Sequence, residues 1–163
     1  MRRRTLSLFA IVATVAITAP LAFAASVPDY RKLIFKIRTQ SVEGTLGFRC
    51  VPTPQGADCP TEQPKYPLKT TGVVKVRQGD QITLLFGAPV GDVSWWTARV
   101  NAQGKEVPTA QGIAKLPNKR SKKRWRIDLP KSLRKSSKIL GVLAQSPNAQ
   151  ASFEVGLQVR SAR

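Results

Sequence analysis

Histidine is absent from this chain of 163 residues, and methionine occurs only at position 1. Serine or cysteine triads that use an imidazole base therefore cannot form. A blue-copper site takes histidine and cysteine ligands with a weak axial methionine, so it is excluded too. The only thiols available as zinc ligands are those of Cys50 and Cys59. The nine acidic residues show no calcium-loop spacing. We expect no bound metal and no other cofactor.

Other catalytic patterns are incomplete. Ser132 and Lys135 match the Ser-x-x-Lys spacing of β-lactamases and penicillin-binding proteins, but the accompanying Ser-Asp-Asn element is missing. Glycoside hydrolysis needs two carboxyl groups at a defined separation. The sequence shows no aromatic-rich, acid-lined cleft around the candidates, which are Glu43, Glu62, Glu106 and Glu154. We therefore expect no catalytic residues and a protein that is not an enzyme.

Long apolar runs are confined to the N-terminus. Three arginines follow Met1, residues 5–23 are mostly apolar, and Ala22-Phe23-Ala24 forms a small-x-small site typical of signal-peptidase cleavage. This pattern predicts a signal peptide at 1–24, cleaved near Ala24, and one domain at 25–163. An uncleaved membrane anchor is the alternative, because the run has about the 20 residues that span a bilayer. We expect no transmembrane segment in the mature chain and a secreted, periplasmic or envelope-associated location.

Only two cysteines are present, and their spacing suits an exported protein with one disulfide between Cys50 and Cys59. The following segment, Val51–Leu68, contains five prolines. Proline and glycine favour turns, so we expect an irregular loop that is tied down by the disulfide.

The remaining chain alternates between apolar and polar residues, which is typical of strands with one buried face. The alternating sets begin at Leu33, Leu46, Val74, Ile82, Trp96, Trp125 and Phe153. Short strands separated by turn residues predict an all-β sandwich or barrel. Only Leu129–Lys138 could hold a helical turn, with Pro130 at its first position.

Three stretches make this pattern resemble the immunoglobulin-like β-sandwich domains of bacterial extracytoplasmic proteins. They are Val74–Leu84, Trp125–Pro130 and Phe153–Val159. The resemblance implies an antiparallel immunoglobulin-like sandwich of about seven to nine strands. Domains of this kind usually bind or space other molecules and seldom catalyse, although fold alone does not fix function.

Positive charge is the strongest functional indication. The formal net charge is +18, and removal of the three N-terminal arginines leaves +15. Solubility of a small domain requires a net charge of only about 2–8. Residues 115–138 carry eleven basic residues and one acid. Within them we predict a loop at Lys119–Lys123, a strand at Arg124–Leu129, and an anion-binding site formed by Lys119, Arg120, Lys122, Lys123, Arg124 and Arg126.

The expected partner is an anionic polymer of the cell envelope or an acidic protein surface. Nucleic acid is not favoured, because its recognition usually adds exposed aromatic side chains as stacking platforms. If Trp96, Ala98 and Val100 face the core, Trp95 faces outward beside Arg99 and could be a contact aromatic. An alternative function follows: an extracytoplasmic interaction domain, such as an accessory subunit, adhesin or inhibitor, that uses Trp95 and the 51–68 loop.

Overall fold

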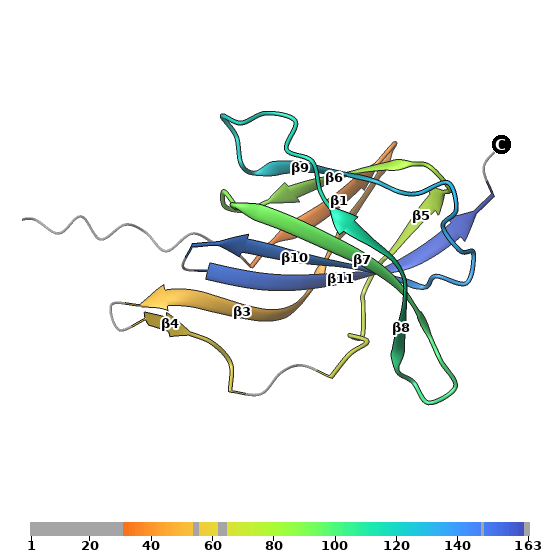
Figure 1. Ribbon diagram of the computed structural model, residues 1–163, viewed down its shortest axis with the longest axis horizontal. Helices are drawn as coiled ribbons and strands as arrows, with labels where there is room; N and C mark the ends of the chain where they lie inside the picture. Colours follow the sequence, from red (N-terminus) through yellow and green to blue (C-terminus); the bar gives the residue numbers. More distant parts are fainter. Residues whose placement is uncertain (1–30, 54–55, 62–64, 148, 162–163) are drawn as a thin grey trace, which may run out of the picture.

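The computed structural model describes residues 31–53, 56–61, 65–147 and 149–161, so the predicted signal peptide at 1–24 lies outside the described residues. These residues form an all-β fold (Figure 1). The first strands are β1 (Leu33–Ile37), β2 (Gln40–Glu43), β3 (Thr45–Thr53), β4 (Gly56–Asp58), β5 (Val73–Arg77) and β6 (Gln81–Phe86). Then follow β7 (Asp92–Val100), β8 (Glu106–Ile113), β9 (Arg124–Asp128), β10 (Ile139–Ser146) and β11 (Ala149–Arg160).

The strands make two sheets. The four-stranded sheet has the order β2-β1-β6-β9, and the larger sheet has the order β4-β3-β11-β10-β7-β8. Neighbours within each order are antiparallel, whereas β5 joins the long strand β11 in parallel. The antiparallel prediction is therefore confirmed for both sheets, with more strands than expected and one parallel pair.

Side chains from both sheets share one hydrophobic core. Leu33, Phe35, Ile82 and Ile127 from the smaller sheet pack with residues such as Phe153 from the larger one. The rings of Phe86 and Phe153 cross the space between the sheets edge to face, with centroids 6.4 Å apart. This arrangement fits a β-sandwich, in which each sheet buries one face against the other.

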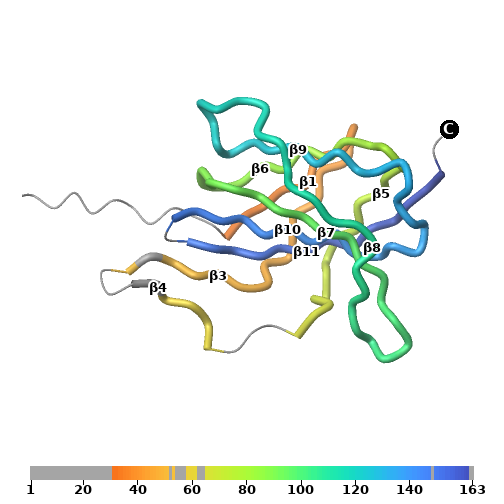
Figure 2. The backbone as a smooth tube through the Cα atoms, viewed as in Figure 1, coloured from red at the N-terminus to blue at the C-terminus, as the bar shows by residue number. Residues whose placement is uncertain are grey.

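Strand β11 is buried on both faces, unlike the half-buried strand that its alternation predicts. Phe153, Val155 and Leu157 point into the core. Ser152 and Glu154, on the opposite face, are also fully covered. The cover comes from the chain that leads into β5 (yellow to yellow-green in Figure 2): the Tyr66 hydroxyl and the Leu68 N–H hydrogen-bond to these two side chains.

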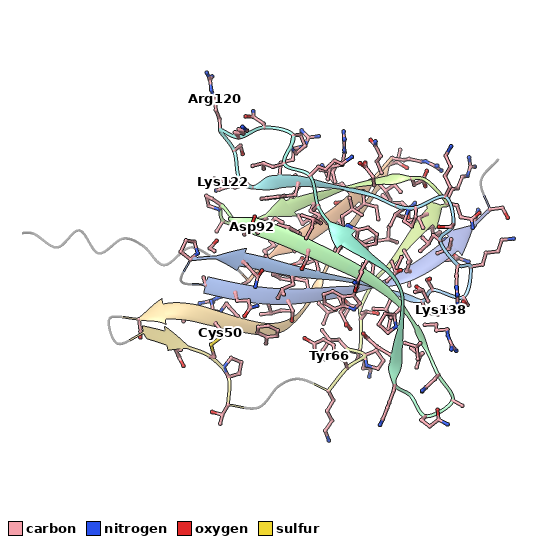
Figure 3. All side chains as sticks on the ribbon, viewed as in Figure 1. Cys50, Tyr66, Asp92, Arg120, Lys122 and Lys138 are labelled. Atoms are coloured by element: carbon pink, nitrogen blue, oxygen red, sulfur yellow. A yellow bond between two sulfur atoms is a disulfide. The ribbon has the colours of Figure 1, made fainter. Side chains whose placement is uncertain are left out.

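The disulfide between Cys50 and Cys59 is confirmed, with Cα atoms 4.2 Å apart (Figure 3). The expectation of an irregular loop at Val51–Leu68 is wrong for its first part. Strand β3 continues to Thr53 and pairs with β4, Val51 lying opposite Asp58. The disulfide therefore closes the base of a short β-hairpin.

Replacing both cysteines by serine is expected to lower the free energy of unfolding by about 2–3 kcal/mol, because an open chain gains entropy when unfolded. Urea titration of the wild type and of the C50S/C59S variant measures this difference. Dithiothreitol should destabilise the wild type by a similar amount and leave the variant unchanged. Equal stability of both proteins without reductant would show that the bridge does not stabilise the fold.

Residues 129–138 do not form the helical turn that the sequence allowed. They make two tight turns, in which the Leu133 N–H donates to the Pro130 carbonyl and the Ser137 N–H donates to the Arg134 carbonyl. The intervening side chain of Leu133 is buried in the core, which pins the connection to the sandwich. Within the described ranges, no helix is long and apolar enough to cross a membrane.

Candidate functional site

The predicted loop at Lys119–Lys123 is confirmed, and its backbone is held firmly against the sandwich. The Lys122 carbonyl accepts hydrogen bonds from the Trp125 indole N–H at 3.0 Å and from the Val90 N–H at 3.0 Å. The Lys123 carbonyl accepts one from the Phe86 N–H at 2.9 Å. Trp125 itself is buried in the core, as the alternation predicted. The carbonyls of this loop therefore point inward while its side chains are free to point outward.

The four basic side chains of the loop and that of Arg124, the first residue of β9, are all exposed: Lys119, Arg120, Lys122, Lys123 and Arg124. We call this set the basic loop. None of the five forms an ion pair with any residue in the described part of the chain. Figure 3 shows Arg120 at the tip, projecting from one end of the molecule. Like charges that lack an internal counterion repel one another, and a bound anion relieves that repulsion.

Arg126, the sixth predicted site residue, differs from the others. Its Nε lies 3.2 Å from Asp128 Oδ1, and Lys115 Nζ lies 2.7 Å from Asp128 Oδ2. The hydrogen bond from Lys115, assisted by the charge of Arg126, holds the pKa of the Asp128 carboxyl below its ordinary value. The structure therefore gives Arg126 an internal counterion that the basic loop lacks.

A second concentration of charge, which we call the basic pocket, was not among the predicted sites. Arg38, Lys75, Arg77 and Arg160 line a cavity of about 130 Å³, together with Gln40 and Val76. Arg77 and Arg160 are direct register partners on the parallel strands β5 and β11. Both alternate with core residues in their strands, but nothing in the sequence spacing indicates that residues 83 positions apart become neighbours.

One acidic residue, Asp80, partly neutralises the positive charge of the basic pocket. Asp80 Oδ1 lies 2.6 Å from an Nη of Arg38, and Asp80 Oδ2 accepts the Arg77 N–H at 2.7 Å. Lys75, Arg77 and Arg160 have no ion-pair partner among the described residues. The C-terminal ends of β5 and β11 lie toward the end of the sandwich away from Arg120, so the two basic regions are separate (Figures 1 and 3).

The prediction that Trp95 is an outward contact aromatic is wrong. Its side chain is 6% exposed and belongs to the core, whereas Trp96 faces the other side of the sheet and is partly exposed. The prediction relied on Ala98 and Val100 to define the inner face. Val100 is in fact exposed, and Ala98 and Thr97 are both buried although they face opposite sides. When two consecutive residues are both buried, the alternation no longer indicates which face of the strand meets the core.

Trp96 lies beside the carboxyl group of Glu106, which is paired with that of Glu154. The sequence did not predict that these two glutamates are neighbours. Its indole N–H donates to Glu106 Oε2 at 3.3 Å. Glu154 is fully buried, and its Oε2 accepts the Leu68 N–H at 2.7 Å. The remaining oxygens, Oε1 of each glutamate, are buried without a hydrogen-bond partner, and the nearby Glu106 carboxyl contributes to a raised pKa of Glu154. Neighbouring carboxyl groups disfavour each other's ionisation.

Burial raises the pKa of Glu154 to about 8, and the neighbouring Glu106 carboxyl adds to the increase. This shift favours the protonated form of Glu154 at neutral pH. The same burial raises the pKa of the nearby Tyr66 hydroxyl.

The sequence gives a faint indication of this carboxyl pair. On the outward face of the last strand, Glu154 stands between Ser152 and Gly156, which are small, where a solvent-exposed face would carry larger polar residues. The sequence showed no aromatic-rich, acid-lined cleft around the candidate acids, but the structure places Glu106 in a cavity with Phe48, Tyr66 and Trp96. No protein-family model, curated protein or solved structure matches this chain.

Proposed function

We propose that this chain is an exported, non-enzymatic binding module that docks on an anionic polymer of the cell envelope. The observation that carries the proposal is the basic loop, which places five exposed cations within six residues on a fixed backbone. A fixed backbone means that less conformational entropy is lost when an anion binds. Arg120 and Arg124 add forked guanidinium groups, which suit phosphate and carboxylate oxygens.

A polymer fits the charge distribution better than a single small anion does. The basic loop and the basic pocket lie at different ends of the sandwich, so one long anionic chain, or a charged surface, can engage both. The predicted signal peptide supports a location where such polymers occur. We also propose that the domain is an immunoglobulin-like sandwich, supported by two face-to-face sheets around one core and by the tight turn at Gly79 that joins β5 to β6.

Salt dependence of binding tests this function. Purified mature protein is incubated with isolated cell envelopes at low and at high ionic strength, and the retained fraction is measured. Retention that falls steeply with salt is expected, because each neutralised phosphate releases condensed counterions. Retention that is insensitive to salt would instead indicate an acidic or other protein partner, to be identified by mass spectrometry. Absence of retention at low salt would exclude the envelope as the binding target.

A further inference from the structure

A cavity of about 260 Å³ lies on the outer face of the larger sheet, away from the core and from both basic regions. Its lining combines three aromatic rings with one carboxyl group: Phe48, Tyr66, Trp96, Glu106, Leu143 and Ser152. These residues come from five strands and from the segment that leads into β5, where Figure 3 shows Tyr66. The volume is slightly below the roughly 300–1,000 Å³ of pockets for drug-sized ligands.

The local charge of this cavity is opposite to that of the whole molecule. Glu106 supplies the carboxyl group of the lining, and the buried Glu154, whose pKa is raised, interacts with it from outside the lining. No lysine or arginine lines the cavity among the described residues. Arg49, Lys65 and Lys105 flank lining residues along the chain; Arg49 is half-buried, Lys65 and Lys105 are exposed, and none of the three lines the cavity. A cation that enters the cavity therefore meets a carboxylate before it meets a like charge.

We propose that this cavity binds a small organic ammonium cation, with its N-alkyl groups against Phe48, Tyr66 and Trp96 and its charge beside Glu106. Aromatic faces attract alkylated ammonium groups through their quadrupole, and the attraction increases when water is excluded. The carboxylate neutralises the charge that the rings alone cannot compensate.

The hydrogen bonds of the lining favour this ligand class over a neutral one. The Trp96 N–H is already occupied by Glu106, and the Tyr66 hydroxyl is 2.8 Å from the Ser152 hydroxyl. Few donors and acceptors are left for a polar neutral molecule such as a sugar. A purely apolar ligand would leave the negative charge of the pair without a counterion in a drier environment, which costs free energy.

Calorimetric titration of the wild-type protein compares three probes: tetramethylammonium, choline and 3,3-dimethyl-1-butanol. The last is the uncharged carbon analogue of choline, so it matches shape and removes charge. We expect choline to bind at least about tenfold more tightly than the uncharged analogue. Equal affinities for the two, or no detectable binding of any probe, would overturn the proposal.

Two matched variants test whether choline binds in this cavity. E106Q removes the charge that faces the cavity, and choline affinity is expected to fall at least about tenfold. E154Q keeps that charge, since its amide can still donate to Glu106, so affinity should change less than about twofold. Equal losses in both variants would contradict the assignment. Circular dichroism checks their folding, and the comparison of probes on the wild type needs no variant.

The ammonium group could be free or carried by a phospholipid. Vesicles of pure phosphatidylcholine distinguish these sources by sedimentation with the wild type and with E106Q. Sedimentation that E106Q abolishes would assign a membrane headgroup to the cavity. Binding of free choline without sedimentation would assign a soluble ligand. Both results support the ammonium site, and neither depends on the basic loop.

Discussion

Reversing four charges of the basic loop, in a K119E/R120E/K122E/K123E variant, is expected to weaken envelope binding on the order of 100-fold at low salt. Each cation that neutralises a phosphate contributes roughly 0.7–0.9 to the slope of log affinity against log salt. Four such contacts are removed and four repulsions replace them, so the slope should fall by at least about three. Titration of envelopes with labelled protein at several salt concentrations measures both quantities.

The fold should tolerate these substitutions, because the side chains that change are exposed and the loop is held through its carbonyls. A matched control is the K131E/R134E/K135E/K138E variant. It makes the same change in net charge in the two turns after β9, and Figure 3 shows Lys138 far from Arg120. We expect a smaller loss for the control. Equal losses would mean that binding follows total charge alone, and the assignment to the basic loop would be wrong.

The sequence predicts the strands well where one face meets the core and the other meets water. Ile82 and Leu84 in β6, and Trp125 and Ile127 in β9, are buried as their alternation indicates. Prediction fails where a second layer covers the outer face. Glu154 alternates correctly with Phe153 and Val155, but it is buried under a segment from a distant part of the chain. Periodicity defines the two sides of a strand and does not report what lies on each.

The candidate sites likewise include one that the sequence predicts and two that it does not. The basic loop is contiguous in sequence, so charge counting and turn residues were sufficient to predict it. The basic pocket and the carboxyl pair depend on contacts between residues far apart in the sequence: Arg38 and Asp80 are 42 positions apart, and Leu68 and Glu154 are 86. For Trp95 and Trp96, assigning the wrong face of the strand to the core led to the wrong tryptophan being predicted at the surface. Long-range pairing, which spacing cannot give, decides these sites.

Stability is expected to decrease as pH rises from about 5 to 8, and Glu154→Gln should remove most of this dependence. The folded state holds a proton on Glu154 up to a pKa of about 8, whereas the unfolded chain releases it near the ordinary value of 4.5. Between these values the folded state binds one more proton, so the free energy of unfolding falls with pH. The limiting slope is about 1.4 kcal/mol per pH unit. Below pH 4.5 the stabilisation is complete, and above about 8 it is lost.

The variant isolates this effect because glutamine resembles the protonated acid. Its carbonyl oxygen can accept from the Leu68 N–H, and its amide can donate to Glu106. We expect E154Q to equal the wild type near pH 5 and to be more stable at pH 8–9. Urea titrations at one-unit intervals measure the difference, and no histidine titrates in the same window.

E106Q serves as the partner control for this measurement. Its amide can donate to an ionised Glu154, which replaces the carboxyl–carboxyl contact that favours the protonated form. The pKa of Glu154 should therefore fall, and the loss of stability should end at a lower pH than in the wild type. If wild-type stability is constant or rises between pH 5 and 8, Glu154 is ionised in the folded protein. The segment that leads into β5 and covers β11 would then hold a carboxylate at Glu154.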